Sequence, residues 1–347
     1  MKIKKKVISN LNKCYSIAPL TYDGKDYFLV AAEKKDPCLL FDLAGRQKDV
    51  IWEEPGGVMS MVQVPGSDGV FLATHKFYSP NDSKDAEIVA VFPKEQGGWD
   101  IKTLVRLPHV HRFDIVTRNG VRYLIACTIK SGHEHKDDWS APGKVYAAVL
   151  PDDLSQYSVE KQLKLDVIKD QMPKNHGYYK VMADGAETCL ISCEKGVYTF
   201  APPGDGGKWE IRQLINEPAS DAVLTDLDGD GEEELVVISP FHGKNIEFYK
   251  KAGNEYKKVY SYTTADFAHA IYGGTLMGQK AVVIGHREGA RDLMVFTWDQ
   301  KNRTYKMEII DHGCGPANVQ KLEHNGEEVL VSANRETNEI AMYTFEK

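Results

Sequence analysis

The sequence lacks the features that mark several large classes of protein. No segment approaches the ~18 consecutive apolar residues of a membrane-spanning helix. The first ten residues, MKIKKKVISN, are basic, but no apolar segment follows them, so they do not form a secretory signal. The chain has no basic excess, because its net charge is -7, and this argues against nucleic-acid and anionic-membrane partners. These absences predict a cytoplasmic protein.

Cysteine is also scarce, with six residues in 347. Cys127, Cys189 and Cys193 lie inside apolar, strand-like segments, where free thiols are commonly buried. We therefore expect free thiols rather than disulfides. The sequence has no G-x-S-x-G motif, no P-loop and no dinucleotide-binding glycine pattern, so it carries no local signature of a serine hydrolase or a nucleotide-binding enzyme.

What the sequence does contain is a repeat of about 45–55 residues along the whole chain. Each copy has an apolar strand, a turn rich in Gly, Asp and Asn, a stronger apolar strand and further strands. The second strands are the clearest, at 27–33, 70–75, 123–129, 189–194, 235–240, 282–286 and 329–334. Helical periodicity is absent over most of the chain. Repeated four-stranded sheets are typical of a β-propeller.

Seven copies fit the chain, so we predict an all-β, seven-bladed propeller of four-stranded antiparallel blades. The last copy ends after three strands, and the segment KIKKKVISN has the character of the missing fourth strand. We therefore expect the N-terminal strand to close the ring, within one domain that covers 1–347. The expected blades are 14–55, 56–108, 109–173, 174–218, 219–264, 265–312, and 313–347 with 1–10.

This geometry converts sequence register into position. The first strand of a blade lines the channel, and its start lies on the same face as the end of the second strand; we call this face the top. Aligning the blades on their second strands places these residues at the top of the first strands: Ser16, Val58, His111, His176, Asp221, His269 and Pro316. Three histidines and an aspartate in consecutive blades, from only 11 histidines in the chain, favour a shared site.

His111, His176, His269 and Asp221 are therefore the candidate ligands of a metal in the channel. Imidazole is the commonest transition-metal ligand, and three histidines with one carboxylate suit Zn, Mn or Fe(II). Ligands on separate strands of a rigid ring need no H-E-x-x-H motif. The alternative interpretation is a wet channel in which these side chains only hold water.

Further polar residues are expected near the same rim. The candidates for proton transfer are His75, His286, Glu194 and Tyr178. The candidates for substrate binding are Lys130, Arg287, Arg335, Tyr272 and Asn334, and His242 lies nearby without an assigned role. The segment 130–144 leaves a second strand on this face, and it forms either a lid over the channel, with Trp139 covering it, or a solvated loop.

An acidic turn, DLDGDGEEE at 226–234, lies between the first and second strands of the fifth blade, on the opposite face. It resembles the D-x-D-G-D-G calcium loop of FG-GAP or VCBS-type propeller repeats. The resemblance implies that Asp226, Asp228, Asp230 and Glu234 are oxygen ligands of a structural Ca²⁺ or Mg²⁺. The alternative is an acidic turn without metal.

Channel histidines combined with such a turn also resemble the propeller part of aldos-2-ulose dehydratases, which act on keto-sugars such as 1,5-anhydrofructose. Those enzymes carry further cupin domains, for which this chain has no room. The resemblance implies a metal-dependent carbohydrate lyase or dehydratase, with a small carbohydrate as substrate. An isomerase would use the same enolate intermediate, and a zinc or manganese lactone hydrolase is a further option.

The alternative class is a non-catalytic propeller that binds glycans or proteins on its top face. In that case the histidines would hydrogen-bond water or ligand, and no turnover would exist. The sequence does not determine the metal, the substrate or the oligomeric state.

Overall fold

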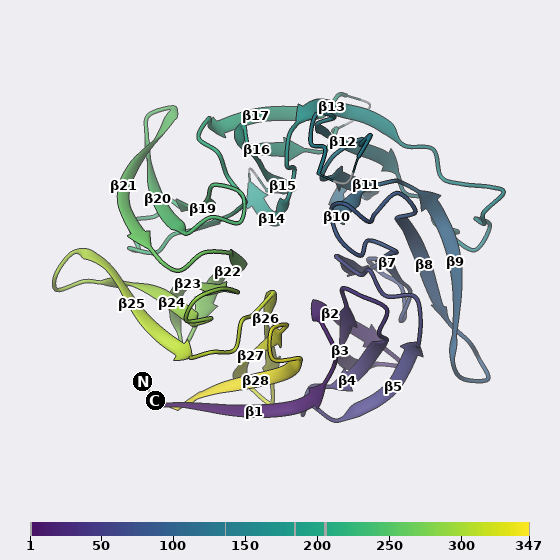
Figure 1. Ribbon diagram of the computed structural model, residues 1–347, viewed down its shortest axis with the longest axis horizontal. Helices are drawn as coiled ribbons and strands as arrows, with labels where there is room; N and C mark the ends of the chain where they lie inside the picture. The colour runs from purple at the N-terminus through teal and green to yellow at the C-terminus, as the bar shows by residue number, and fades with distance from the viewer. Residues whose placement is uncertain (1, 136, 184, 205–206, 347) are drawn as a thin grey trace.

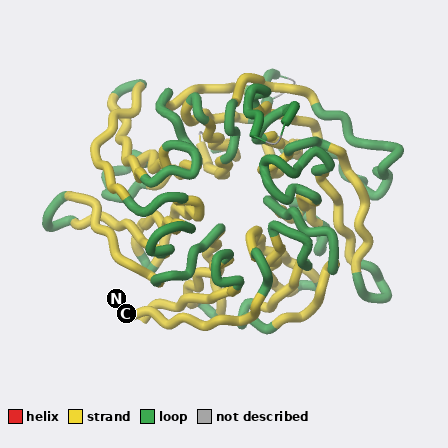
Figure 2. Tube along the Cα trace, in the orientation of Figure 1, coloured by secondary structure: helices red, strands yellow, loops and turns green. Residues whose placement is uncertain are grey.

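The computed structural model describes residues 2–135, 137–183, 185–204 and 207–346. These residues form strands and loops without a helix (Figure 2). Accordingly, the described chain offers no helix with the length and apolar character to cross a membrane. The strands make seven four-stranded antiparallel sheets that surround a central axis (Figure 1). The predicted all-β, seven-bladed propeller is therefore confirmed.

The blades follow one another along the chain. Blade one is β2 (Cys14–Tyr22), β3 (Lys25–Ala32), β4 (Cys38–Asp42) and β5 (Gln47–Trp52). Blade two is β6 (Met61–Gln63), β7 (Phe71–His75), β8 (Glu87–Pro93) and β9 (Trp99–Arg106). Blade three is β10 (Val110–Arg118), β11 (Val121–Thr128), β12 (Gly143–Val149) and β13 (Asp166–Met172). Blade four is β14 (Gly177–Ala183), β15 (Ala186–Cys193), β16 (Gly196–Ala201) and β17 (Glu210–Ile215).

The remaining three blades repeat the same order. Blade five is β18 (Asp221–Thr225), β19 (Glu234–Ser239), β20 (Asn245–Ala252) and β21 (Glu255–Thr263). Blade six is β22 (Ala268–Leu276), β23 (Gln279–His286), β24 (Leu293–Asp299) and β25 (Thr304–Asp311). Blade seven is β26 (Asn318–His324), β27 (Glu327–Asn334), β28 (Glu339–Glu346) and β1 (Lys2–Asn10).

The N-terminal strand closes the ring, as predicted. β1 is antiparallel to β28, from Lys2 opposite Glu346 to Asn10 opposite Glu339. The two chain ends therefore lie side by side (Figure 1). This pairing holds the first and last segments of the chain in one sheet and completes the fourth strand of blade seven.

The core lies between the blades rather than within one central layer. Seven apolar clusters of buried residues lie mainly between neighbouring blades. The second strands supply much of this core, and β7 and β27 are buried along most of their length. All six cysteines are buried and free, which confirms the expectation of unpaired thiols.

The first strands of the blades are inside the ring, where neighbouring ones contact each other. Because every blade runs in the same direction, their starting ends meet at one face of the channel. This arrangement positions the candidate site.

Candidate functional site

In three blades, a β-bulge near the start of the first strand places a side chain at the top of the channel. Tyr15 in β2, His111 in β10 and His269 in β22 are each the extra residue where the ladder to the second strand shifts by one. A β-bulge redirects the side chain of the extra residue. The hydroxyl of Tyr15 lies 2.9 Å from Nε2 of His269, so bulges from blades one and six meet across the channel.

His176 comes from the fourth blade and is held by a carboxylate. It immediately precedes β14, and its Nδ1 lies 2.8 Å from Oδ2 of Asp221, the first residue of β18. The hydroxyl of Ser220 donates to the same carboxylate oxygen at 3.1 Å. His176 and Asp221 are both almost fully buried, so this pair is shielded from solvent.

His242, which received no role from the sequence, completes the cluster from a loop. It follows β19 with a backbone φ of 51° and reaches back over the channel. Its ring stacks between Phe241 and Phe267, with centroid distances of 3.9 and 4.0 Å. Its Nε2 lies 3.3 Å from Nε2 of His176. Stacking between two aromatic rings therefore fixes the imidazole of His242, although this residue lies in a loop and not in a strand.

Hydrogen bonds set the tautomers of the strand histidines. Nδ1 of His269 lies 2.7 Å from the carbonyl oxygen of Ala317, and Nδ1 of His111 lies 3.1 Å from that of His176. A carbonyl oxygen only accepts, so each Nδ1 carries the proton, and the neutral ring keeps a lone pair at Nε2. The Asp221 carboxylate also only accepts, so Nδ1 of His176 carries a proton as well. The Nε2 atoms are therefore the ones available to bind a ligand.

Burial keeps three of the imidazoles in the channel neutral. It lowers the pKa of His111, His242 and His269 well below the usual value, and the neighbouring His176 and Arg112 lower it further. Removing a positive charge from water is costly, and a second positive charge nearby adds to that cost. At neutral pH each of these three rings is therefore neutral and has one nitrogen with a lone pair.

The geometry fits a transition metal. One ring nitrogen each of His176, His242 and His269 lies within 4.8 Å of the others. In tetrahedral coordination with bonds of about 2.0–2.1 Å, ligand nitrogens are about 3.3–3.4 Å apart, which matches the 3.3 Å between His176 and His242. The bond from Asp221 to Nδ1 of His176 is the outer-shell contact typical of metal-binding histidines.

This group differs from the predicted ligand set in two members. His176 and His269 are in the group, whereas His242 takes the place expected for His111. The ring of His111 lies beside it, 4.5 Å from that of His176 between centroids. Asp221 orients His176 through Nδ1 and is not one of the grouped ligands.

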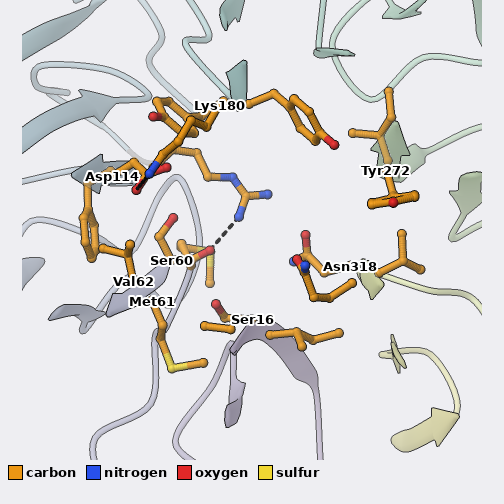
Figure 3. Close-up of a pocket in the computed structure, with 18 of the residues that line it drawn as sticks. Ser16, Ser60, Met61, Val62, Asp114, Lys180, Tyr272 and Asn318 are labelled. Atoms are coloured by element: carbon orange, nitrogen blue, oxygen red, sulfur yellow. Dashed lines mark hydrogen bonds and ion pairs between the residues drawn. The ribbon is translucent and has the colours of Figure 1, made fainter. Parts of the chain in front are cut away.

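A cavity of about 560 Å³ occupies the channel next to the histidines. His269 and Asp221 line it at the top, and residues further along the first strands line the rest. Figure 3 shows Lys180 beside Asp114 on one side, with Tyr272 and Asn318 opposite. Above the cluster, Phe241 packs on His176 and Trp139 packs on Phe241. The cavity is large enough for a monosaccharide-sized ligand.

The residues expected to transfer protons do not gather at this cluster. His286 uses both ring nitrogens, because Nδ1 is bonded to the carbonyl of Glu288 and Nε2 accepts from the backbone of Asp292. Glu194 pairs with Lys174 at 3.1 Å.

His75 packs against Trp52, and its buried Nε2 has no partner among the described residues. Tyr178 does line the cavity, but its hydroxyl points to Sγ of Cys189, and burial raises its pKa.

The expected substrate-binding residues are mostly engaged elsewhere. Arg287 and Arg335 both bind Glu336. Asn334 is buried and bonded to Tyr343.

Lys130 donates a hydrogen bond to Asn81, and its ammonium group lies 4.8 Å from the ring centre of Trp139. These two contacts anchor the 130–144 loop. Lys136 of that loop lies outside the described residues. Of the five, Tyr272 lines the cavity.

The acidic turn holds its own cation. Asp226, Asp228 and Glu234 come together, but Nζ of Lys250 in β20 lies between Asp228, Asp230 at 2.6 Å and Glu234 at 3.5 Å. Asp226 accepts hydrogen bonds from the backbone of the turn. The single ammonium group lies between these carboxylates and offsets part of their negative charge. A Ca²⁺ or Mg²⁺ ion at this turn would have to displace it, and the expected ion stays a prediction.

Comparison with known proteins finds other structures with this fold but does not assign the chain to a family. No protein-family model and no curated protein sequence matches the chain, so the FG-GAP or VCBS likeness stays a resemblance. Among solved structures, streptogramin B lyase is similar, with a TM-score of 0.58, 12% identity, and coverage of 99% of this chain and 98% of that chain.

Two other similar structures show how widely this architecture is used. A "putative 6-phosphogluconolactonase" of Bacteroides fragilis has a TM-score of 0.58 and 15% identity, with coverage of 96% and 91%. BBS1N, solved in complex with ARL6DN, has a TM-score of 0.59 and 12% identity, with coverage of 99% and 96%. At these identities the likeness defines a seven-bladed β-propeller and carries no activity with it.

Proposed function

We propose that this propeller is a divalent-metal-dependent enzyme that forms an enolate from a keto-sugar in its channel, as a lyase or an isomerase does. The observation that carries the proposal is the group of His176, His242 and His269, whose ligand nitrogens converge beside a cavity. The proposal is also supported by the hydrogen bonds that fix the tautomers of His176 and His269, to Asp221 and to the carbonyl of Ala317. A water-holding channel does not require such convergence.

A divalent ion on this group would act as a Lewis acid that polarises a sugar carbonyl. His111 is the candidate to remove the proton from the adjacent carbon, because its ring lies 4.5 Å from that of His176 between centroids and its Nδ1 is already bonded to the carbonyl of His176. The proton moves from carbon to Nε2, and the C–H electron pair forms the enolate. Loss of a β-hydroxyl as water then completes elimination, whereas reprotonation of the neighbouring carbon completes isomerisation.

The Tyr15 hydroxyl and a metal ion would compete for the same nitrogen. Tyr15 donates to Nε2 of His269 at 2.9 Å, and a ligated Nε2 would release that hydroxyl to a substrate oxygen. Tyr15 is fully buried, and burial raises its pKa to about 12. It therefore acts as a neutral hydrogen-bond donor and not as a base.

Two of the similar structures guide the choice of substrates. One is named a lyase and another a "putative 6-phosphogluconolactonase"; neither shares enough sequence to transfer an activity. Lactones therefore join keto-sugars in the panel to be tested, because lactone hydrolysis needs a polarised carbonyl but no enolate.

Solvent-deuterium exchange tests the proposal directly. Protein loaded with Zn, Mn or Fe(II) is incubated in D₂O with 1,5-anhydrofructose, other keto-sugars and gluconolactones, and followed by proton NMR. We expect the signal of the proton next to the carbonyl to disappear. The variant His111→Gln should abolish this exchange while keeping its metal. Lactone hydrolysis without exchange would make the protein a hydrolase, and no reaction with any substrate would favour a binding propeller.

A further inference from the structure

Arg112 stands out among the charged residues of the channel. It follows the bulged His111 in β10 and lines the cavity. Its Nη1 donates to the carbonyl oxygen of Met59 at 2.5 Å, and its guanidinium carbon lies 5.6 Å from the ring centre of Tyr15. Within the described residues no carboxylate lies in ion-pair distance of this guanidinium, and its side chain is only partly exposed.

The other cations near the channel are paired. Lys180 lines the same cavity, but its Nζ lies 3.1 Å from Oδ1 of Asp114. Arg287 pairs with Glu336 at 2.8 Å, and Arg335 with the same residue at 2.7 Å. Partly buried charges usually have a partner of opposite sign, because an unpaired one loses hydration without compensation. Arg112 therefore lacks the anion that this environment favours.

The carboxylates in the cavity do not supply that anion. Asp114 is held by Lys180 and by the backbone of Ile115. Asp221 is held by His176 and Ser220. Among the described residues, the guanidinium of Arg112 has one hydrogen bond to the protein, from Nη1 to the carbonyl of Met59. The planar arrangement of its five N–H donors matches a carboxylate or a phosphate.

Arg112 is also close to the histidine group. Its guanidinium lies over the ring of Tyr15, whose hydroxyl is 2.9 Å from Nε2 of His269. Arg112 and His269 both line the same cavity. One small molecule in the cavity can therefore contact Arg112 and the histidine group together.

We propose that Arg112 is the anion-binding residue of the channel, so the substrate is a sugar that carries a carboxylate or a phosphate group. This inference rests on the proposed function, because it places the reacting carbonyl at the histidines and the anionic group at Arg112. It makes Arg112 a specificity-determining residue and excludes neutral sugars as the preferred ligands.

Equilibrium binding to metal-free protein tests this inference without any turnover. Chelator-treated protein is titrated calorimetrically with glucose, gluconate, 6-phosphogluconate and inorganic phosphate at two salt concentrations. We expect gluconate or 6-phosphogluconate to bind at least tenfold more tightly than glucose. A preference for gluconate identifies a carboxylate subsite, and tight binding of 6-phosphogluconate and inorganic phosphate identifies a phosphate subsite.

Matched variants locate the effect. Arg112→Gln should remove the preference for the anionic sugar, whereas Arg112→Lys, which keeps the charge but not the planar donors, should retain part of it. The control is Arg212→Gln, because Arg212 also donates to a backbone carbonyl, that of Asn254, but lies on the outer strand β17. Arg112→Lys also keeps the test informative if the Gln variant does not fold.

The two proposals fail separately. Equal binding of glucose and the anionic sugars, or an unchanged preference in Arg112→Gln, would overturn the anion subsite even if the metal-loaded protein turns over a neutral keto-sugar. A preference that depends on Arg112, in a protein without deuterium exchange on any substrate, would support the subsite and contradict the proposed enolate chemistry.

Discussion

Replacing Asp221 with asparagine should weaken metal binding without removing a ligand. The carboxylate lies 2.8 Å from Nδ1 of His176 and is buried with it. Asparagine has the same shape and still offers an oxygen to Nδ1, but it removes the negative charge that makes the imidazole a better electron donor. Loss of such an outer-shell carboxylate costs about 10–100-fold in metal affinity, or about 1.4–2.7 kcal/mol. Competition between the protein and a chromophoric zinc chelator measures this change.

The structure offers a matched control for this experiment. Asp292 also faces histidine rings, with Oδ1 3.0 Å from Nδ1 of His312, but it lies outside the histidine group. Asp292→Asn should leave zinc affinity unchanged. An unchanged affinity in Asp221→Asn, or equal losses in both variants, would refute the assignment of Asp221 as the partner that orients a metal ligand.

Three further predictions follow from individual contacts. Tyr15→Phe removes the hydroxyl that competes for Nε2 of His269; by titration with the chelator its zinc affinity should rise several-fold, and a loss would make Tyr15 a ligand instead. Lys250→Met removes the internal cation of the acidic turn; 5 mM Ca²⁺ should then raise the melting temperature by roughly 2 °C, with no rise in the wild type, and equal responses would refute the role of Lys250. Burial lowers the pKa of His75 to about 3, so the unfolded chain takes up the proton first as pH falls below about 6.5, and stability decreases in that window. Between pH 7 and 5 the wild type should lose about 2 kcal/mol more than His75→Phe in urea unfolding, and identical pH profiles would contradict this.

The sequence was sufficient to predict the fold because the same strand pattern recurs in every blade. Each blade is a weak signal, but seven copies at a similar spacing fix the strand order, and the shortage of one strand in the last copy predicts the pairing of β1 with β28. The same repetition located the tops of the first strands, and so it identified His176 and His269 as neighbours.

The remaining features of the site depend on contacts that register does not encode. Alignment on the second strands placed Ser16 at the top of the first strand of blade one, whereas the structure has the bulged residue Tyr15 there, one position earlier. β10 and β22 have bulges at the equivalent position. Comparison of Cys14-Tyr15-Ser16 with the segments around His111 and His269 could therefore have identified Tyr15 from the sequence.

His242 was missed for a different reason. It lies in a loop, and its position depends on a left-handed backbone conformation and on stacking between Phe241 and Phe267. Neither contact follows from strand spacing. Lys250 likewise reaches the acidic turn from another strand, about 20 residues further along the chain, so the DLDGDG motif alone could not show that a cation is already built in.

Metal content is the measurement that tests the central claim most directly. The untagged protein, reconstituted with Zn, Mn or Fe(II) and dialysed, is analysed by inductively coupled plasma mass spectrometry beside His242→Ala, His269→Ala and the control His312→Ala, whose side chain is 77% exposed. We predict about one transition-metal ion per chain in the wild type and in the control, and its loss in the other two variants while they remain folded. A wild-type protein without metal after reconstitution, or retention of the metal by both His242→Ala and His269→Ala, would contradict the assignment of this group as a metal centre.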